Sequence, residues 1–235
     1  MSDNKLRVDV WSDIACPWCF VGKRRLEAAL DQFEHRDEVE VIWHAFELDP
    51  TAPSVLPTEP SYVERLAKKY RCSTEQGQAM IDRMVQTAAA DGLAFRFDKI
   101  RPGNTFDAHR LIHLAQERGK QDAVKERFLT AYLEEGEPIG DGEALRRLAT
   151  EAGLDEAEVT EVLESDAYAE DVRNDERTAA SLGVSGVPFF VFAQRFGVSG
   201  AQPAEALAEV LEQAYHQTNE AMIEEGAACG PEGCD

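Results

Sequence analysis

The sequence predicts an α/β protein in which a four-stranded mixed sheet carries a large all-helical insertion between its second and third strands. Three observations lead to this fold class. A strand–helix–strand pattern spans residues 5–46, helical periodicity fills residues 61–182, and two short strands and a helix close the chain. We therefore expect a sheet domain of residues 1–60 and 183–225, a helical insertion domain of residues 61–182, and a tail of residues 226–235.

The first strand–helix–strand unit is predicted from periodicity. Residues 5–12 alternate polar and apolar side chains, and residues 39–46 read as a second, mostly buried strand. Between them, the apolar side chains of residues 17–34 recur at helical spacing. Two strands joined by a helix within so short a segment predict a parallel pair.

The middle of the chain is predicted to be helical. Four prolines between residues 50 and 60 form a stiff connector. Apolar residues then recur at three- and four-residue spacing, and glycines at positions 92, 119, 136 and 153 fall where helices should end. The expected helices are residues 61–71, 74–91, 105–118, 121–135, 141–152, 155–164 and 168–182.

The closing elements follow Pro188. The apolar run of residues 189–193 predicts a buried strand, and residues 196–199 are expected to pair with it through a tight turn at Gln194-Arg195. Residues 203–225 then have the periodicity of a long helix.

The most informative segment is Cys16-Pro17-Trp18-Cys19, at the junction between the first strand and the first helix. Proline suits the first helical position, which makes Cys16 the N-cap. Its sulfur is then expected to face the unpaired N–H groups of the first turn, which favour negative charge and should lower the pKa of Cys16. Because the thiolate is the nucleophile in disulfide exchange, we predict that Cys16 attacks a disulfide and that Cys19, one turn further, resolves the intermediate.

Two other interpretations of this Cys pair are open. One CxxC is half of a zinc site, which takes four ligands, but the second close pair, Cys229 and Cys234, lies at the far terminus. None of the five histidines has a ligand-like spacing from Cys16 or Cys19. Two buried, inert cysteines are the other alternative. A CxxC beside a strand–helix–strand pattern favours redox chemistry, so we assign no metal and no organic cofactor.

Composition narrows the function classes. The 235 residues are 43 % hydrophobic and carry 45 acidic and 24 basic side chains, a formal net charge of −21. Nucleic acid and anionic membranes require positive charge, so neither is an expected partner. No apolar run approaches the roughly 20 residues that span a bilayer, and the first residues lack the apolar stretch of a signal peptide. We expect a cytoplasmic protein whose five cysteines are working thiols.

The CPWC motif between strand and helix, and Gly-Val-Pro before an apolar strand, together resemble the thioredoxin fold. The helical insertion resembles its DsbA-like branch. Four local strings resemble the cytoplasmic FrnE-type subfamily: WSD at residues 11–13, NTFDAHRL at 104–111, GVPFF at 186–190 and GAQP at 200–203. The resemblance covers essentially the whole chain. It implies a thiol–disulfide oxidoreductase acting on protein or small-molecule disulfides and thiols, with glutathione as one candidate.

The resemblance also implies roles near the third strand. In that superfamily the proline matching Pro188 is cis and lies against the active cysteines, and the backbone of the residue matching Val187 pairs with an extended substrate. Without the resemblance, Pro188 is an ordinary strand-initiating proline. Periplasmic DsbA-like oxidants typically carry histidine where Trp18 stands. Because Trp18 supplies no positive charge, we expect a less oxidising couple and an exposed tryptophan that adds to the substrate surface.

The tail holds the second Cys pair, in the segment CGPEGC. Its glycines and proline favour a turn, and a turn can bring the Cα atoms of Cys229 and Cys234 within disulfide range. Some FrnE-type proteins resemble this in carrying a second, C-terminal Cys pair. We expect an auxiliary dithiol that exchanges electrons with the CPWC pair. A metal-binding tail, suited to Zn or Cu(I), and an accidental exposed pair are the alternatives.

Four further residues are weaker candidates. Asp13 stands three residues before Cys16 and is a possible cleft residue: it is either a group that tunes the pKa of Cys16 or a polar residue at a strand end. The resemblance suggests that Asn104 and His109 line the cleft facing the cysteines, although a helix-face position explains His109 equally well. Cys72 is a lone thiol in a loop or at a helix end.

Three function hypotheses follow. The first is a thiol–disulfide oxidoreductase, with isomerase activity included. The second is a glutathione-dependent isomerase or transferase of the kappa-class type, which shares the fold and insertion but usually has serine where Cys16 stands. The third is a thiolate protein that binds metal or holds peptides without catalysis. The presence of both Cys16 and Cys19 favours the first. The oligomeric state is not predicted.

Overall fold

The computed structural model describes residues 5–228, and side chains for residues 5–218. Its strands are β1 (Leu6–Ser12), β2 (Val39–Ala45), β3 (Phe189–Phe192) and β4 (Phe196–Ser199). Its α-helices are α1 (Pro17–Asp31), α2 (Tyr62–Tyr70), α3 (Thr74–Ala90), α4 (Phe106–Glu117), α5 (Gln121–Thr130), α6 (Gly142–Glu151), α7 (Glu156–Glu164), α8 (Ala169–Ser181) and α9 (Ala204–Ala228). A 3-10 turn, η1 (Arg36–Glu38), precedes β2, and a π-helical turn, η2 (Ala131–Glu135), extends α5.

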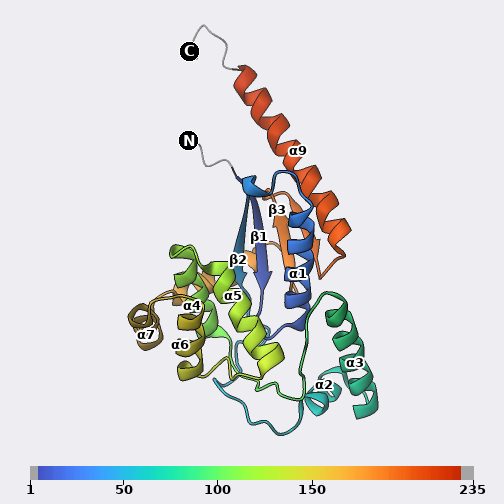
Figure 1. Ribbon diagram of the computed structural model, residues 1–235, viewed down its shortest axis with the longest axis vertical. Helices are drawn as coiled ribbons and strands as arrows, with labels where there is room; N and C mark the ends of the chain where they lie inside the picture. The colour runs from blue at the N-terminus through green and yellow to red at the C-terminus, as the bar shows by residue number, and fades with distance from the viewer. Residues whose placement is uncertain (1–4, 229–235) are drawn as a thin grey trace.

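The four strands form one mixed sheet in the order β2-β1-β3-β4. β1 and β2 are parallel, with Val10 opposite Trp43. β3 runs antiparallel to β1, with Phe190 opposite Val10, and antiparallel to β4. The predicted α/β fold class, with a helical insertion between the second and third strands, is confirmed (Figure 1).

Helices cover both sides of β1. α1 and α9 pack against each other, and α9 contacts β1 and β3 (Figure 1). Val8 and Val10 belong to the main core that includes both of these helices. The next side chain along the strand, Trp11, packs instead with Ala179 of α8 and with Val184. Because successive strand residues point to opposite faces, β1 is buried from both sides, which explains its nearly continuous apolar sequence.

The inserted helices form two groups (Figure 1). α2 and α3 pack together, and α3 contacts α1 near the start of α1. α4, α5 and α8 contact β2. The edge of that strand is closed by Gln121 of α5, whose side chain accepts from the N–H of Trp43 at 3.0 Å and donates to its C=O at 2.9 Å. Sheet and insertion thus share one hydrophobic core, and the division into separate domains stays a prediction.

Two local predictions differ from the structure. α1 ends at Asp31, three residues before the expected end. The β3–β4 turn is centred on Ala193 and Gln194, and the prediction placed it at Gln194-Arg195. Ala193 and Gln194 have positive φ angles of 49° and 55°, and the N–H of Arg195 donates to the C=O of Phe192 at 3.0 Å. Two positive φ angles match the twist of a hairpin, but alanine and glutamine are not residue types that predict positive φ.

Within residues 5–228, no helix has the length and hydropathy to cross a membrane.

Candidate active site

The CPWC segment forms the first turn of α1. Cys16 is the N-cap in an extended conformation, and Pro17 occupies the first turn, as predicted. The N–H of Cys19 donates to the C=O of Cys16 at 3.0 Å, which closes the turn. Both cysteines are free thiols. Cys16 is 5 % exposed and borders a pocket, whereas Cys19 is fully buried. An incoming disulfide can therefore reach Cys16 first.

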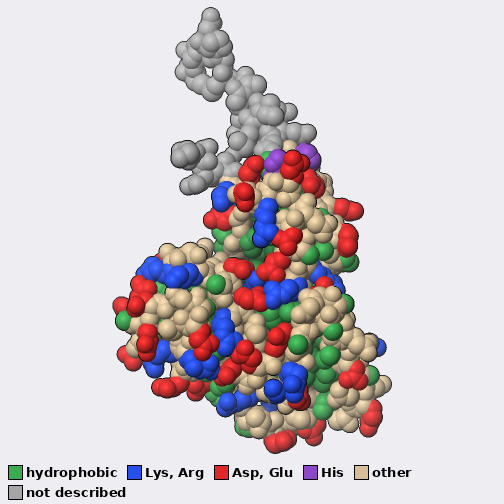
Figure 2. Space-filling model, viewed as in Figure 1, with side chains coloured by type: hydrophobic (Ala, Val, Ile, Leu, Met, Phe, Trp, Pro, Cys, Tyr) green, Lys and Arg blue, Asp and Glu red, His purple; other side chains and the backbone are tan. Residues whose placement is uncertain are grey.

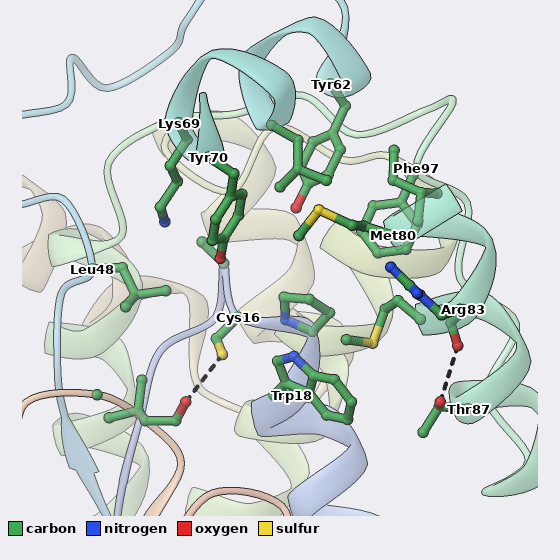
Figure 3. A pocket seen from close by; sticks show the side chains of 17 residues that line it. Cys16, Trp18, Leu48, Tyr62, Lys69, Tyr70, Met80, Arg83, Thr87 and Phe97 are labelled. Carbon is green, nitrogen blue, oxygen red and sulfur yellow. Dashed lines mark hydrogen bonds between the residues drawn. The ribbon is translucent and has the colours of Figure 1, made fainter. Parts of the chain in front are cut away.

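The loop before β3 lies against this turn. The Sγ of Cys16 donates a hydrogen bond to the C=O of Val187 at 3.5 Å, shown as a dashed line in Figure 3. The Val187–Pro188 peptide bond is cis. Pro188 packs on Gly22 of α1: a Cβ added to Gly22 would meet the Cγ of Pro188 at 2.9 Å. The fold thus brings together residues 16, 187 and 188, as the resemblance implied.

The surroundings of Cys16 favour the neutral thiol. Its sulfur makes no capping hydrogen bond to the first turn of α1, and its hydrogen bond to Val187 requires the thiol proton. The adjacent Cys19 thiol, burial and the carboxylate of Asp13 raise the pKa of Cys16 well above its ordinary value. The prediction of a lowered pKa is therefore wrong: the backbone N–H of Cys19 does lower the pKa of Cys16, but the Cys19 thiol, burial and the Asp13 carboxylate outweigh it.

Asp13 and His109 lie beneath the cysteine turn and do not border the pocket. The carboxylate of Asp13 accepts from the N–H of Leu48 at 2.8 Å and from Ala15 at 3.3 Å, and lies 3.4 Å from the Nε2 of His109. Burial raises the pKa of Asp13, but His109 and the Leu48 N–H outweigh it, so the pKa is lowered. The predicted cleft position is therefore wrong for both Asp13 and His109, because both side chains are buried and pair with each other. The charge of Asp13 does act on Cys16, whose pKa it raises.

Asn104 does not border the pocket either. Its side-chain oxygen accepts from the N–H of Phe106 at 2.8 Å, and its amide donates to Glu47 at 3.0 Å. The residue lies just before the N-cap of α4 and ties this helix to the segment after β2, so both of its polar atoms have partners that do not border the pocket. The predicted cleft position of Asn104 is wrong for this reason.

Sequence reasoning missed Lys125, a fully buried lysine on α5. Its Nζ donates to the C=O of Ser12 at 3.2 Å, at the end of the strand that leads to the cysteines. Burial lowers the pKa of Lys125 to about 8, although negative charge on Cys19 and Asp13 opposes this. The sequence signal that could have indicated its burial is helical spacing. Gln121 and Leu129 lie four residues before and after Lys125 on the same face of α5, and both are buried.

A pocket of about 580 Å³ opens beside Cys16 (Figure 3). Trp18, 43 % exposed, forms part of its wall, as predicted. Helices α2 and α3 supply the opposite wall. Most of the wall is apolar or aromatic, and the residues from these two helices are Tyr62, Leu66, Lys69, Tyr70, Met80, Ile81, Arg83, Met84 and Thr87. The sequence predicted these helices as part of the insertion but gave no reason to face them towards Cys16.

The remaining thiols are less informative. Cys72 follows α2 and is a half-buried free thiol. Cys229 and Cys234 lie outside the described residues. Among the side chains of residues 5–218, no three or more His, Cys, Asp or Glu are grouped in a way that could hold a metal ion.

Fold and site together define a thioredoxin-fold protein with a dithiol at a helix N-terminus beside a cis-proline. The family of DSBA-like thioredoxin domains matches residues 7–212. The chain belongs to this family and is an enzyme of the DsbA-like oxidoreductase class.

The chain is similar to several individual proteins. A probable DsbA oxidoreductase from Streptomyces coelicolor is 46 % identical, with 98 % of each chain covered and a TM-score of 0.83. The uncharacterized protein YwbO of Bacillus subtilis is 32 % identical over 190 residues, covering 79 % of this chain and 86 % of that protein. The cytosolic disulfide reductase DsbM of Pseudomonas aeruginosa, solved with GSH, shares the fold at 19 % identity and a TM-score of 0.61, with 90 % and 100 % of the chains covered.

Proposed function

We propose that this protein exchanges thiols and disulfides through Cys16 and Cys19 in the cytoplasm. The observation that carries the proposal is the unequal access of the two sulfurs. Cys16 borders the pocket, and Cys19 is buried one turn further along α1. A nucleophile must meet its substrate, whereas a resolving thiol needs only to reach the nucleophile.

The reaction has two balanced steps. The Cys16 thiol loses its proton, its sulfur attacks one sulfur of a substrate disulfide, and the other substrate sulfur leaves and takes up a proton. Cys19 then loses its proton and attacks the Sγ of Cys16, which releases the second substrate thiol. Two electrons pass from the protein dithiol to the substrate, and a Cys16–Cys19 disulfide remains. The same steps in reverse oxidise a substrate dithiol, and both directions together isomerise disulfides.

The surroundings of Cys16 support reduction and isomerisation over oxidation. DsbA is a strong oxidant because its reduced form is stabilised, with a nucleophilic thiolate of very low pKa. Here the pKa of Cys16 is raised by Cys19, burial and Asp13, so the reduced form lacks that stabilisation. We therefore place the couple nearer the reducing end of the thioredoxin-fold range.

We assign substrate positioning to Val187, Pro188 and Trp18. The C=O of Val187 already accepts from Cys16, and an extended substrate can pair with the same backbone segment. The exposed ring of Trp18 offers an apolar surface beside the sulfur. Suitable partners are protein disulfides and small thiols. The bound GSH of the DsbM structure supports glutathione as one of these, and neither nucleic acid nor membrane is required.

Lys125 and the C-terminal cysteine pair also take part in the proposed exchange reaction. Lys125, whose pKa is lowered to about 8 by burial and which interacts electrostatically with Cys19, accepts in its neutral amine form the proton that Cys19 loses in the second step, since an amine titrating near neutral pH suits proton transfer. Cys229 and Cys234 act as an auxiliary dithiol that reduces or oxidises the CPWC pair. This last role rests on the sequence alone.

The direct test replaces each cysteine in turn and follows insulin reduction with dithiothreitol as electron donor. Cys16→Ser should abolish the activity, and Cys19→Ser should accumulate mixed disulfides on Cys16 that mass spectrometry detects. Cys72→Ser is the matched control and should retain full activity. An active Cys16→Ser variant refutes the proposal.

The pocket volume also favours a second function, that of a glutathione-dependent isomerase or transferase. A pocket of about 580 Å³ beside Cys16 is large enough for a small organic substrate. That chemistry needs one thiol, so it survives Cys19→Ser, whereas disulfide reduction does not. Turnover of an electrophile with glutathione by the Cys19→Ser variant would identify this function.

A further inference from the structure

Two basic side chains stand at the pocket beside Cys16. Lys69 comes from α2 and Arg83 from α3, and both border the pocket. In Figure 3 they lie on opposite sides of Cys16 and Trp18. The rest of the wall is apolar, aromatic or neutral, and no Asp or Glu is part of it.

Neither cation has a carboxylate partner among the side chains described for residues 5–218. The ammonium of Lys69 lies 5.9 Å from the ring of Tyr70, and Arg83 forms no ion pair there. This is notable in a chain with 45 acidic and 24 basic residues, where arginines elsewhere pair readily, for example Arg118 with Glu158 at 2.7 Å. Figure 2 likewise shows acidic side chains spread over the visible face.

The general field of this protein repels anions, because its formal net charge is −21. The Debye length is about 8 Å at physiological ionic strength, so a ligand inside the pocket responds chiefly to the charges that border it. Those charges are the ammonium of Lys69 and the guanidinium of Arg83, and the latter offers the two parallel donors that match a carboxylate.

We propose that this pocket selects low-molecular-weight disulfides that carry carboxylates, with Lys69 and Arg83 binding the carboxylates while Cys16 attacks the disulfide. The proposal rests on the exchange function proposed above and names its substrate class. The apolar walls hold the body of the ligand, and the disulfide meets Cys16 at the border of the pocket. The reduced protein gives two electrons and two protons, and two anionic thiols leave.

The test uses a charge series of three disulfides: oxidised glutathione, which is anionic, bis(2-hydroxyethyl) disulfide, which is neutral, and cystamine, which is cationic. The full-length protein is reduced, mixed with each disulfide, and followed in a single turnover by intrinsic tryptophan fluorescence. Signals that persist in Cys16→Ser are subtracted. This design needs no recycling reductant, and the dependence of rate on concentration separates binding from the maximal rate.

The Lys69→Gln, Arg83→Gln double variant should bind oxidised glutathione about three- to tenfold more weakly, the range expected for two exposed ion pairs. Its maximal rate should be unchanged, because the contacts are equal in the ground and transition states. The neutral disulfide should be unaffected. Lys69→Glu with Arg83→Glu should reverse the preference towards cystamine. Lys68→Gln is the matched control, because Lys68 lies on the same helix, is exposed, and does not border the pocket.

The outcomes separate this proposal from the general function. If the neutral disulfide reacts through Cys16 but the double variant changes all three disulfides equally, or none, the charge selection is refuted and the exchange function stands. If no disulfide oxidises Cys16, the exchange function itself fails. Added salt should narrow the difference between wild type and the double variant for oxidised glutathione, and a difference independent of salt also refutes the proposal.

Discussion

The Sγ of Cys16 lies 3.5 Å from the main-chain oxygen of Val187, although the two residues are 171 positions apart in the sequence. This contact joins the start of α1 to the cis Val187–Pro188 bond before β3. A carbonyl only accepts, so this contact stabilises the protonated thiol of Cys16, in line with the raised pKa of that residue. An incoming substrate has to displace this contact before or during attack.

Removing the negative charge of Asp13 should lower the pKa of Cys16. Asp13 is a buried carboxylate, and its charge is among the causes that raise the pKa of Cys16. In Asp13→Asn the amide oxygen can still accept from Leu48, but the charge is gone. The ultraviolet absorbance of the thiolate should then appear at lower pH than in wild type, and alkylation of Cys16 at neutral pH should be faster.

The control for this experiment is Asp122→Asn on α5, an exposed carboxylate that contacts Lys23 and Trp43 and is not among the groups that raise the pKa of Cys16. It should leave the titration of Cys16 unchanged. A titration of Asp13→Asn that is unchanged, or moved to higher pH, would contradict the electrostatic role of Asp13.

Gly22 should be needed for the packing of the Val187–Pro188 loop. A Cβ at this position would meet the Cγ of Pro188 at 2.9 Å and the ring of Phe190 at 3.2 Å. Gly22→Ala is expected to destabilise the protein by about 1–3 kcal/mol through overpacking, despite the better helix propensity of alanine, and to reduce disulfide exchange by moving Pro188. Urea unfolding and insulin reduction measure the two effects.

Gly142→Ala is the matched control, because it opens α6 and has nothing within 4 Å of the added Cβ. It should be as stable as wild type or slightly more stable. Equal behaviour of the two alanine variants would show that α1 and Pro188 are not tightly packed.

Lys125→Met should slow the second step of exchange and spare the first. The substitution removes the buried amine whose pKa is lowered to about 8 by burial, so Cys19 loses its proton acceptor. Mixed disulfides on Cys16 should persist longer in rapid acid quenching, while their formation keeps its wild-type rate. Lys125→Arg restores a positive charge but not an amine that titrates near neutral pH, so it should not restore the rate. Equal slowing of both steps would indicate a general structural effect.

The sequence predicted elements better than environments. The helix expected at residues 74–91 is found at Thr74–Ala90, because its apolar spacing and the glycine at position 92 are local signals. The turn centred on Ala193 and Gln194 was predicted one residue too late, since positive φ at these residue types has no local sequence signature. The pKa of Cys16 was predicted in the wrong direction because the Cys19 thiol, burial and the Asp13 carboxylate raise it, and the burial depends on segments distant in sequence, such as the loop that brings Val187 to the sulfur. A helix N-terminus is visible in sequence, but the partner that competes with it is not.

His44 should make stability depend on pH. Its imidazole on β2 lies 2.7 Å from Asp9 of β1 and 2.7 Å from Asp175 of α8. Burial lowers the pKa of His44, but the two carboxylates outweigh it and raise the pKa from 6.5 to about 9. Protonated His44 therefore stabilises the folded protein, fully so below the unfolded pKa of 6.5. This stabilisation is lost as the pH rises through the folded pKa of about 9. The shift corresponds to about 3 kcal/mol at most.

His44→Gln should therefore lower the free energy of unfolding most near pH 6 and progressively less towards pH 10, as urea unfolding of wild type and variant at each pH measures. His216→Gln, on an exposed part of α9, should cost little at any pH. A cost of His44→Gln that is the same at both ends of this range would mean that the imidazole is neutral in the folded protein and that it contributes packing rather than charge.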